Sequence, residues 1–168
     1  MTTHTFLALA ALALLGVVAV QNYWVPLLRQ KTISSGLTGP YDGLLLAAFA
    51  LLSAALVLAF RHQGAGEYIA DAAAGFLVLT GVSGRFSDDL PDGELWHTRF
   101  TAVTFVLAIT LQFVMNGHNA ALWVITGGAI LYALTTHFLV SNASVTEKVG
   151  VTGLCLWLAA WGLTQHQA

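Results

Sequence analysis

The sequence predicts an all-α integral membrane protein, a bundle of six transmembrane helices that forms a single domain over residues 1–168. Of these residues, 57% are hydrophobic and only 8% are charged, and the charges are confined to short patches. Asp, Glu, Lys and Arg are absent from five long stretches, 1–28, 43–60, 72–84, 100–146 and 149–168. A charged side chain at the centre of a bilayer costs about 2.5–3.5 kcal/mol, so long uncharged runs are typical of chains that cross a membrane.

The predicted helices follow the apolar runs in order. They cover residues 5–24, 43–60, 68–84, 98–115, 120–140 and 146–164. Each is close to the roughly 20 residues that span a bilayer, and together with short connections they nearly fill the chain. The first helix lacks the basic residues that precede the core of a signal peptide, and its apolar run is longer than such a core, so it is expected to be retained.

The remaining helices carry local signals of their own. The second and third are rich in alanine and glycine, which let helices approach closely in lipid. Only four polar residues, 116–119, separate the fourth from the fifth, which predicts a tight turn and an antiparallel hairpin. Residues 144–147 have the spacing of a capping box before the sixth helix, so Glu147 is interpreted as a capping residue rather than a catalytic one. Three tryptophans near predicted helix ends are expected to anchor at the membrane interface: Trp24, Trp96 and Trp161.

Six crossings would place the connections after the first, third and fifth helices on one side of the membrane, which we call the loop-rich face. This face carries five of the six Lys and Arg residues, Arg61 being the exception. The positive-inside rule therefore places it in the cytoplasm, and a bacterial cytoplasmic membrane is the expected location. Because loops held by a rigid scaffold carry most functional sites, we expect function on this face.

The densest polar segment, 83–99, lies on the loop-rich face and contains the turn-forming Pro91-Asp92-Gly93. One interpretation is a solvated loop in which Arg85 and Arg99 neutralise two of the four carboxylates. The alternative is a polar pocket above the bundle. Its candidate ligand-binding residues are Arg85, Asp88, Asp89, His97, Arg99 and His137.

His97 is predicted to open the fourth helix and to lie within direct or one-water hydrogen-bonding reach of Asp88 or Asp89. The reason is that a buried polar group left unpaired costs about 1–3 kcal/mol. Together with His137, these residues would suit zinc, but the chain has no HxxxH or HExxH motif. A b-type haem would need two axial ligands at matching depth on facing helices. The two candidate histidines, His97 and His137, both lie near the interface, which argues against a haem between the helices. Neither a metal nor a cofactor is therefore expected.

Four segments resemble a known family: 33–40 (ISSGLTGP), Gly84-Arg85-Phe86-Ser87-Asp88, His97 and Glu147-Lys148. In this order they are similar to the uncharacterised six-helix membrane family called domain of unknown function 998, with the DRAM/Frag/Sfk-type membrane proteins as more distant relatives. The resemblance implies a six-helix architecture, a polar site around Asp88 and His97, and a first loop outside the cell. It implies no particular reaction.

We expect the protein to bind or sense a lipid or small amphiphile, or to support a membrane complex, through the loop-rich face. Basic side chains there would meet phosphate headgroups: Arg29, Lys31, Arg85 and Arg99. One alternative is a metal-dependent intramembrane hydrolase that uses Asp88, Asp89, His97 and His137. Another is an accessory subunit of a larger complex. Expected partners are membrane lipids and other membrane subunits, whereas the net charge of −2 argues against nucleic acid.

Overall fold

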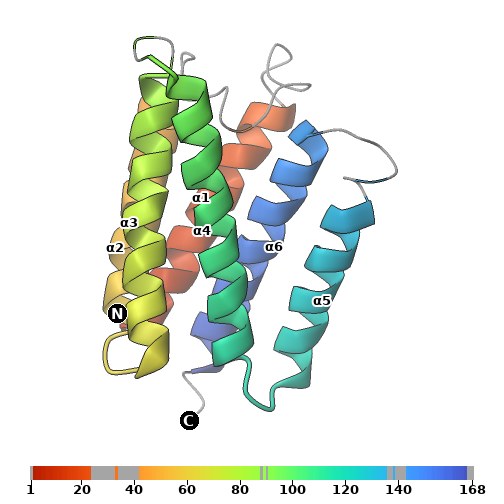
Figure 1. The fold of residues 1–168 in the computed structure, drawn as a ribbon. Coiled ribbons are helices and arrows are strands. Elements are labelled where there is room, and N and C mark those ends of the chain that lie inside the picture. Colours follow the sequence, from red (N-terminus) through yellow and green to blue (C-terminus); the bar gives the residue numbers. More distant parts are fainter. Residues whose placement is uncertain are drawn as a thin grey trace.

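A computed structural model describes residues 2–23, 33, 42–87, 89, 91–135, 138 and 143–165 of the chain. Within these ranges there are six α-helices and no strand, so the predicted all-α class is confirmed. The helices are α1 (Thr3–Tyr23), α2 (Asp42–Ala59), α3 (Ala65–Arg85), α4 (Gly93–Met115), α5 (Ala120–Thr135) and α6 (Ala143–Thr164) (Figure 1).

Four helices, α1 to α4, are long and apolar enough to cross a membrane. The most apolar is α2, whose mean hydropathy over its 18 residues is 2.2. α5 is also apolar, but its described part has 16 residues, which is short of the roughly 20 that a crossing needs. These helices are typical of a membrane protein, as the uncharged runs of the sequence predict.

α4 begins at Gly93, five residues before the predicted start at 98. Asp92 precedes it in the left-handed conformation, with a φ of 56°. The carbonyl of Asp92 accepts the first helical hydrogen bond from the backbone of Trp96 at 3.0 Å. A Cβ on Gly93 would collide with the backbone carbonyl of Ser87, so only glycine fits where the chain turns into the helix. His97 therefore lies in the second turn of α4 and not at its start.

The helices pack in an order that differs from their order in the chain. α1, α2, α3 and α4 are successive neighbours, while α6 returns to pack against the other side of α1, and α5 packs against α6. Figure 1 shows α5 at the edge of the bundle beside α6. The tight turn between α4 and α5 is confirmed, with the N–H of Asn119 donating to the carbonyl of Asn116 at 3.0 Å. The expected hairpin is not a packed pair, however, because α5 touches α4 only weakly.

α6 approaches both of its neighbours closely at glycines. A Cβ on Gly162 would lie 2.6 Å from the backbone carbonyl of His4 in α1, and a Cβ on Gly153 would collide with the Cβ of Ala129 in α5. Small residues thus replace bulky side chains at both contacts, as expected for helices that pack in lipid. The position of α6 between α1 and α5 depends on these two residues.

Aromatic rings fill the core where Phe60, directly after α2, meets α6. The ring of Trp161 stacks on Phe60 with centroids 4.3 Å apart. Trp157, one turn before Trp161 in α6, stacks on Trp161 with centroids 6.2 Å apart. Trp161 is only 1% exposed, so its predicted role as an interfacial anchor is wrong: its ring packs against Phe60 and not at the membrane surface. Trp96 is 47% exposed, as an anchor requires, and Trp24 lies outside the described residues.

A buried hydrogen-bond network joins the last three helices. The indole N–H of Trp157 in α6 donates to Oδ1 of Asn116 at 2.6 Å. The amide nitrogen of Asn116, at the end of α4, donates to the hydroxyl of Thr126 in α5 at 3.2 Å. Each of the three residues is at most 2% exposed. Because a low-dielectric interior strengthens hydrogen bonds and penalises unpaired groups, this network fixes the turn between α4 and α5 onto α6.

Replacing the amide at the centre of this network should destabilise the protein. We expect Asn116→Leu to lower the free energy of unfolding by about 1–3 kcal/mol, because the N–H of Trp157 stays buried without its acceptor. The measurement is thermal or denaturant unfolding in detergent micelles. Gln63→Leu is the control, since Gln63 is an exposed amide in the turn between α2 and α3. Equal effects of the two substitutions would contradict the role of the network.

Candidate functional site

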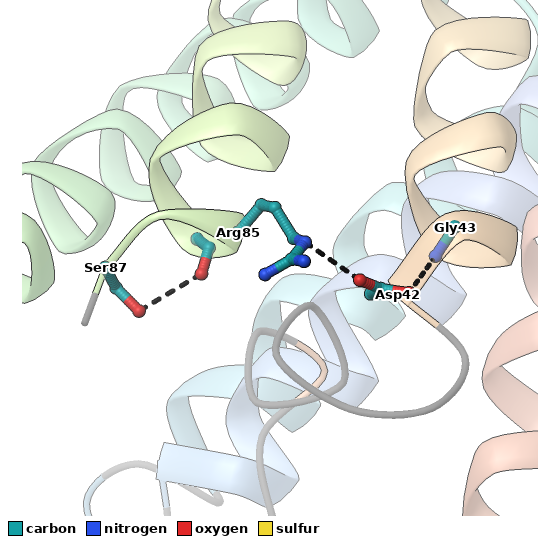
Figure 2. Close-up of polar contacts among 5 residues, drawn as sticks. Asp42, Gly43, Arg85 and Ser87 are labelled. Carbon is teal, nitrogen blue, oxygen red and sulfur yellow. Dashed lines mark hydrogen bonds and ion pairs between the residues drawn. The ribbon is translucent and has the colours of Figure 1, made fainter. Parts of the chain in front are cut away.

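An ion pair joins α2 and α3 on the loop-rich face. Figure 2 shows Arg85, at the end of α3, pointing toward Asp42, at the start of α2. The Nε of Arg85 lies 2.8 Å from Oδ2 of Asp42, and Oδ1 of Asp42 accepts the backbone N–H of Gly43 at 2.6 Å. Ser87 folds back to donate to the carbonyl of Gly84 at 3.1 Å. The sequence places Asp42 on the same face as Arg85, but Asp42 is not among the candidate residues predicted from it.

The two arginines of the polar segment are held by groups other than its carboxylates. Arg85 is paired with Asp42, and its guanidinium also lies 5.8 Å from the ring centroid of Phe86. The guanidinium of Arg99 lies over the ring of Trp96, 5.3 Å from its centroid, which is a cation–π contact. The interpretation that both arginines neutralise carboxylates of the 83–99 loop is therefore not what the described residues show.

His97 is buried between α3 and α4, with 8% of its surface exposed. Its Nδ1 lies 3.0 Å from the carbonyl of Thr80 and 3.4 Å from the hydroxyl of Ser83, both in α3. A carbonyl only accepts, so Nδ1 carries a proton in this contact. Among the residues that the structure describes, Nε2 has no hydrogen-bond partner.

The carboxylates predicted beside His97 are not found with it in the described part of the chain. Asp89 is exposed, and its backbone N–H donates to the carbonyl of Phe86 at 3.1 Å. No hydrogen bond or ion pair joins Asp89 to His97 among the described contacts. The candidates Asp88 and His137 lie outside the described residues. Of the six predicted site residues, Arg85, Asp89, His97 and Arg99 are described, and no described hydrogen bond or ion pair joins any two of them.

No group of three or more His, Cys, Asp or Glu side chains that could hold a metal ion occurs among the described residues. Two of the four residues in the metal hypothesis, Asp88 and His137, fall outside that set. The protonated Nδ1 and free Nε2 of His97 match the form of a metal-bound histidine, but no described carboxylate or imidazole completes a site. The arrangement seen around His97 supports packing of α3 on α4.

A groove of about 760 Å³ lies elsewhere, between α1, α5 and α6. Its lining is predominantly apolar: Leu15 and Val18 come from α1, Val124 and Ile125 from α5, and Leu156 from α6. Gly128 lines it too, and a Cβ there would meet no atom within 4 Å, so the space beside α5 is open. A groove of this kind on the side of a bundle can take an apolar chain lengthwise.

Polar residues of the groove occur toward the loop-rich face. Lys148, in the first turns of α6, and Tyr132, near the described end of α5, both line it there. Thr152 follows Lys148 by four residues and so lies on the same side of α6. Sequence analysis did not find this groove. Two features of the sequence could have indicated it. The four-residue spacing of Lys148 and Thr152 indicates a polar face on α6, and the two glycines of α5 leave space where other residues would have side chains.

Glu147 holds Ile33, which lies between α1 and α2 in the sequence, against the start of α6. Its Oε2 accepts the backbone N–H of Ile33 at 2.9 Å, and Ile33 is buried in the core. α6 begins at Ala143, so Ser144 lies inside the helix and not at its N-cap, in contrast to the predicted capping box. Glu147 therefore has a structural role, as predicted, but this role is a hydrogen bond to the distant Ile33 and not the capping of α6.

Comparison of the chain with protein-family models, with curated proteins and with solved structures finds no match in any of the three. The resemblance to the six-helix family drawn from the sequence stays a prediction.

Replacing His97 by leucine should cost little stability. We expect the free energy of unfolding to change by no more than about 1 kcal/mol, because the substitution removes the contacts of Nδ1 with Thr80 and Ser83 but also removes the unpaired Nε2. The measurement is unfolding in detergent, with the exposed His118→Leu as control. A loss as large as that expected for Asn116→Leu would show that Nε2 has a partner in the folded protein.

Proposed function

We propose that this protein crosses the membrane six times and binds a single membrane lipid, or an amphiphile of similar shape, in the groove between α1, α5 and α6. The groove is the observation that carries the proposal: it is open, apolar along most of its length, and polar toward the loop-rich face. This proposal keeps the ligand class that we expect from the sequence. It moves the apolar part of the site away from the 83–99 loop.

Several features support six crossings. α1 to α4 each have the length and hydropathy of a crossing. The uncharged run that begins with α5 extends in the sequence through residue 140, which gives about the 20 residues that a crossing needs. The turns after α2 and α4 lie at the same end of the bundle as the start of α1 and the end of α6 (Figure 1). An even number of crossings requires this placement.

The lining of the groove supports a lipid ligand. In a bilayer, lipid tails are as apolar as leucine. Acyl chains therefore fill a groove that no side chain of the protein occupies, because they restore packing contacts for its lining. The polar groups that line it, among them Lys148 and Tyr132, suit the headgroup of the same molecule. The metal-dependent hydrolase stays a prediction, since no described group of residues favours it, and so does the accessory subunit.

Single cysteines test the topology in a Cys155→Ala background, which removes the buried native thiol. We expect a membrane-impermeant maleimide to label Gln63→Cys and His118→Cys alike in intact cells, either both or neither. Glu94→Cys should give the other result: labelled if those two are not, and unlabelled if they are. All three positions are exposed, the first two in turns at one end of the bundle and the third at the other end. Different labelling of positions 63 and 118 would exclude an antiparallel α3–α4 pair that crosses the membrane.

Filling the groove should displace the lipid. We expect Gly128→Leu to weaken lipid binding about tenfold, roughly 1.4 kcal/mol, because the new side chain would compete for space and overpacking costs about 1–3 kcal/mol. The measurement is native mass spectrometry of the detergent-solubilised protein titrated with phosphatidylglycerol. Gly127→Leu is the matched control: Gly127 is also exposed and free of neighbours within 4 Å, but it does not line the groove. Equal affinities of the two variants would overturn the proposed site.

A further inference from the structure

One carboxylate lies on the outer surface of the bundle, away from both ends of its helix. Asp71 is exposed in α3, which is long and apolar enough to span a membrane from Ala65 to Arg85. Asp71 and Arg85 are fourteen residues apart in the sequence, which is about 21 Å at 1.5 Å per residue. Because a hydrocarbon core is about 30 Å thick, the two charges cannot both lie outside it. Helix tilt shortens their distance along the membrane normal and leaves this result unchanged.

Asp71 is the charge that the membrane core would enclose. Arg85 is at the loop-rich end of α3, where its Nε lies 2.8 Å from Oδ2 of Asp42. The long side chain of arginine can also reach the headgroup layer, whereas the short side chain of aspartate stays close to its helix. Asp71 would therefore lie about 9 Å inside the opposite boundary of the core. A carboxyl group at this depth, charged or neutral, lacks the water that would bond it at the surface.

The described part of the chain offers no partner to this carboxylate. No described hydrogen bond or ion pair reaches the side chain of Asp71. Arg61, in the turn before α3, is exposed and makes no described ion pair with it. The nearby Glu67 accepts the backbone N–H of His62 at 3.0 Å and so belongs to the same turn. Asp71 is thus left exposed on the outside of α3 with its hydrogen-bonding capacity unused.

The surface around Asp71 suits a second helix. Exposed residues follow one side of α3 at helical spacing: Tyr68, Asp71, Gly75, Val78, Leu79 and Val82. A Cβ on Gly75, one turn after Asp71, would meet no atom within 4 Å, so another backbone can approach closely there. Close approach at small residues and polar contacts between helices are the features that associate helices in lipid.

We propose that this side of α3 docks a transmembrane helix of another protein, whose Lys or Arg side chain pairs with Asp71 beside Gly75. The inference goes beyond the lipid groove, but it rests on the proposed crossings, which place Asp71 in the membrane core. At low dielectric a cation is the partner that an unpaired carboxylate favours most. A second copy of this chain fits less well, because a symmetric contact between two α3 helices would set Asp71 opposite itself.

Photo-crosslinking in the native membrane tests this docking. The crosslinking amino acid p-benzoylphenylalanine replaces Val78, which is 44% exposed and lies two turns after Asp71 on the same side of α3. We expect one protein adduct, and sequencing of the crosslinked peptide should place it in an apolar segment that contains Lys or Arg. The same crosslinker at Leu131, an exposed position of α5, is the control and should not give this adduct.

Substitutions at Asp71 and Gly75 make the test specific. We expect Asp71→Asn and Gly75→Leu each to lower the yield of the adduct about tenfold, as for the loss of a polar or close-packed contact between membrane helices. Asp71→Glu keeps the carboxylate and should retain most of the yield. The matched controls are Asp89→Asn, at an exposed aspartate of the loop-rich end, and Gly127→Leu, at an exposed glycine of α5 with no neighbour within 4 Å. Both should leave the yield unchanged.

The outcomes separate this inference from the lipid groove. The docking site would be overturned by any of four results: no protein adduct at Val78, an adduct unaffected by Asp71→Asn, an adduct with a second copy of this chain, or a partner segment without Lys or Arg. None of these results bears on Gly128→Leu, which tests the groove independently. Labelling of positions 63, 94 and 118 tests the crossings, and a result that excluded them would overturn the membrane depth of Asp71 and the inference with it.

Discussion

The close packing of α6 between α1 and α5 organises this bundle. Gly162 lets α6 approach the backbone of α1 at His4, and Gly153 lets it approach α5 at Ala129. Because α5 has little contact with α4, α6 is its main support in the described structure. The groove opens along the same three helices, and its lining includes the small residues Gly128, Ala129 and Gly153. The features that bring α6 close to its neighbours thus also define the proposed binding site.

The requirement to satisfy polar groups inside an apolar protein explains most other contacts. Trp157, Asn116 and Thr126 form a buried network that joins three helices. His97 meets the same requirement only at Nδ1, through the carbonyl of Thr80. The two cases differ in what they contribute to stability. The network around Asn116 holds helices together, whereas His97 leaves one buried ring nitrogen unpaired among the described residues.

On the loop-rich face, contacts within one helix and contacts between distant parts of the chain hold charged side chains in place. Arg85 is paired with Asp42, Arg99 lies over Trp96, and Glu147 binds the backbone of Ile33. These three side chains are thereby placed in structural contacts. Lys148, beside Glu147, lines the apolar groove. Our proposed function places the headgroup of the lipid at the polar end of the groove, close to the loop-rich face that composition and loop length indicate.

The amino-acid sequence alone determined the all-α class and the approximate positions of the helices, because the cost of charge in lipid leaves long uncharged runs that can be read directly. It also indicated the tight turn at 116–119. The start of α4, the burial of Trp161 and the partner of Arg85 depend on the tertiary structure, because each results from contact with a residue in another element or loop. The groove shows this most clearly. Leu15, Tyr132 and Lys148 line one space although the first is more than 100 residues from the others, and no local pattern indicates which helices pack side by side.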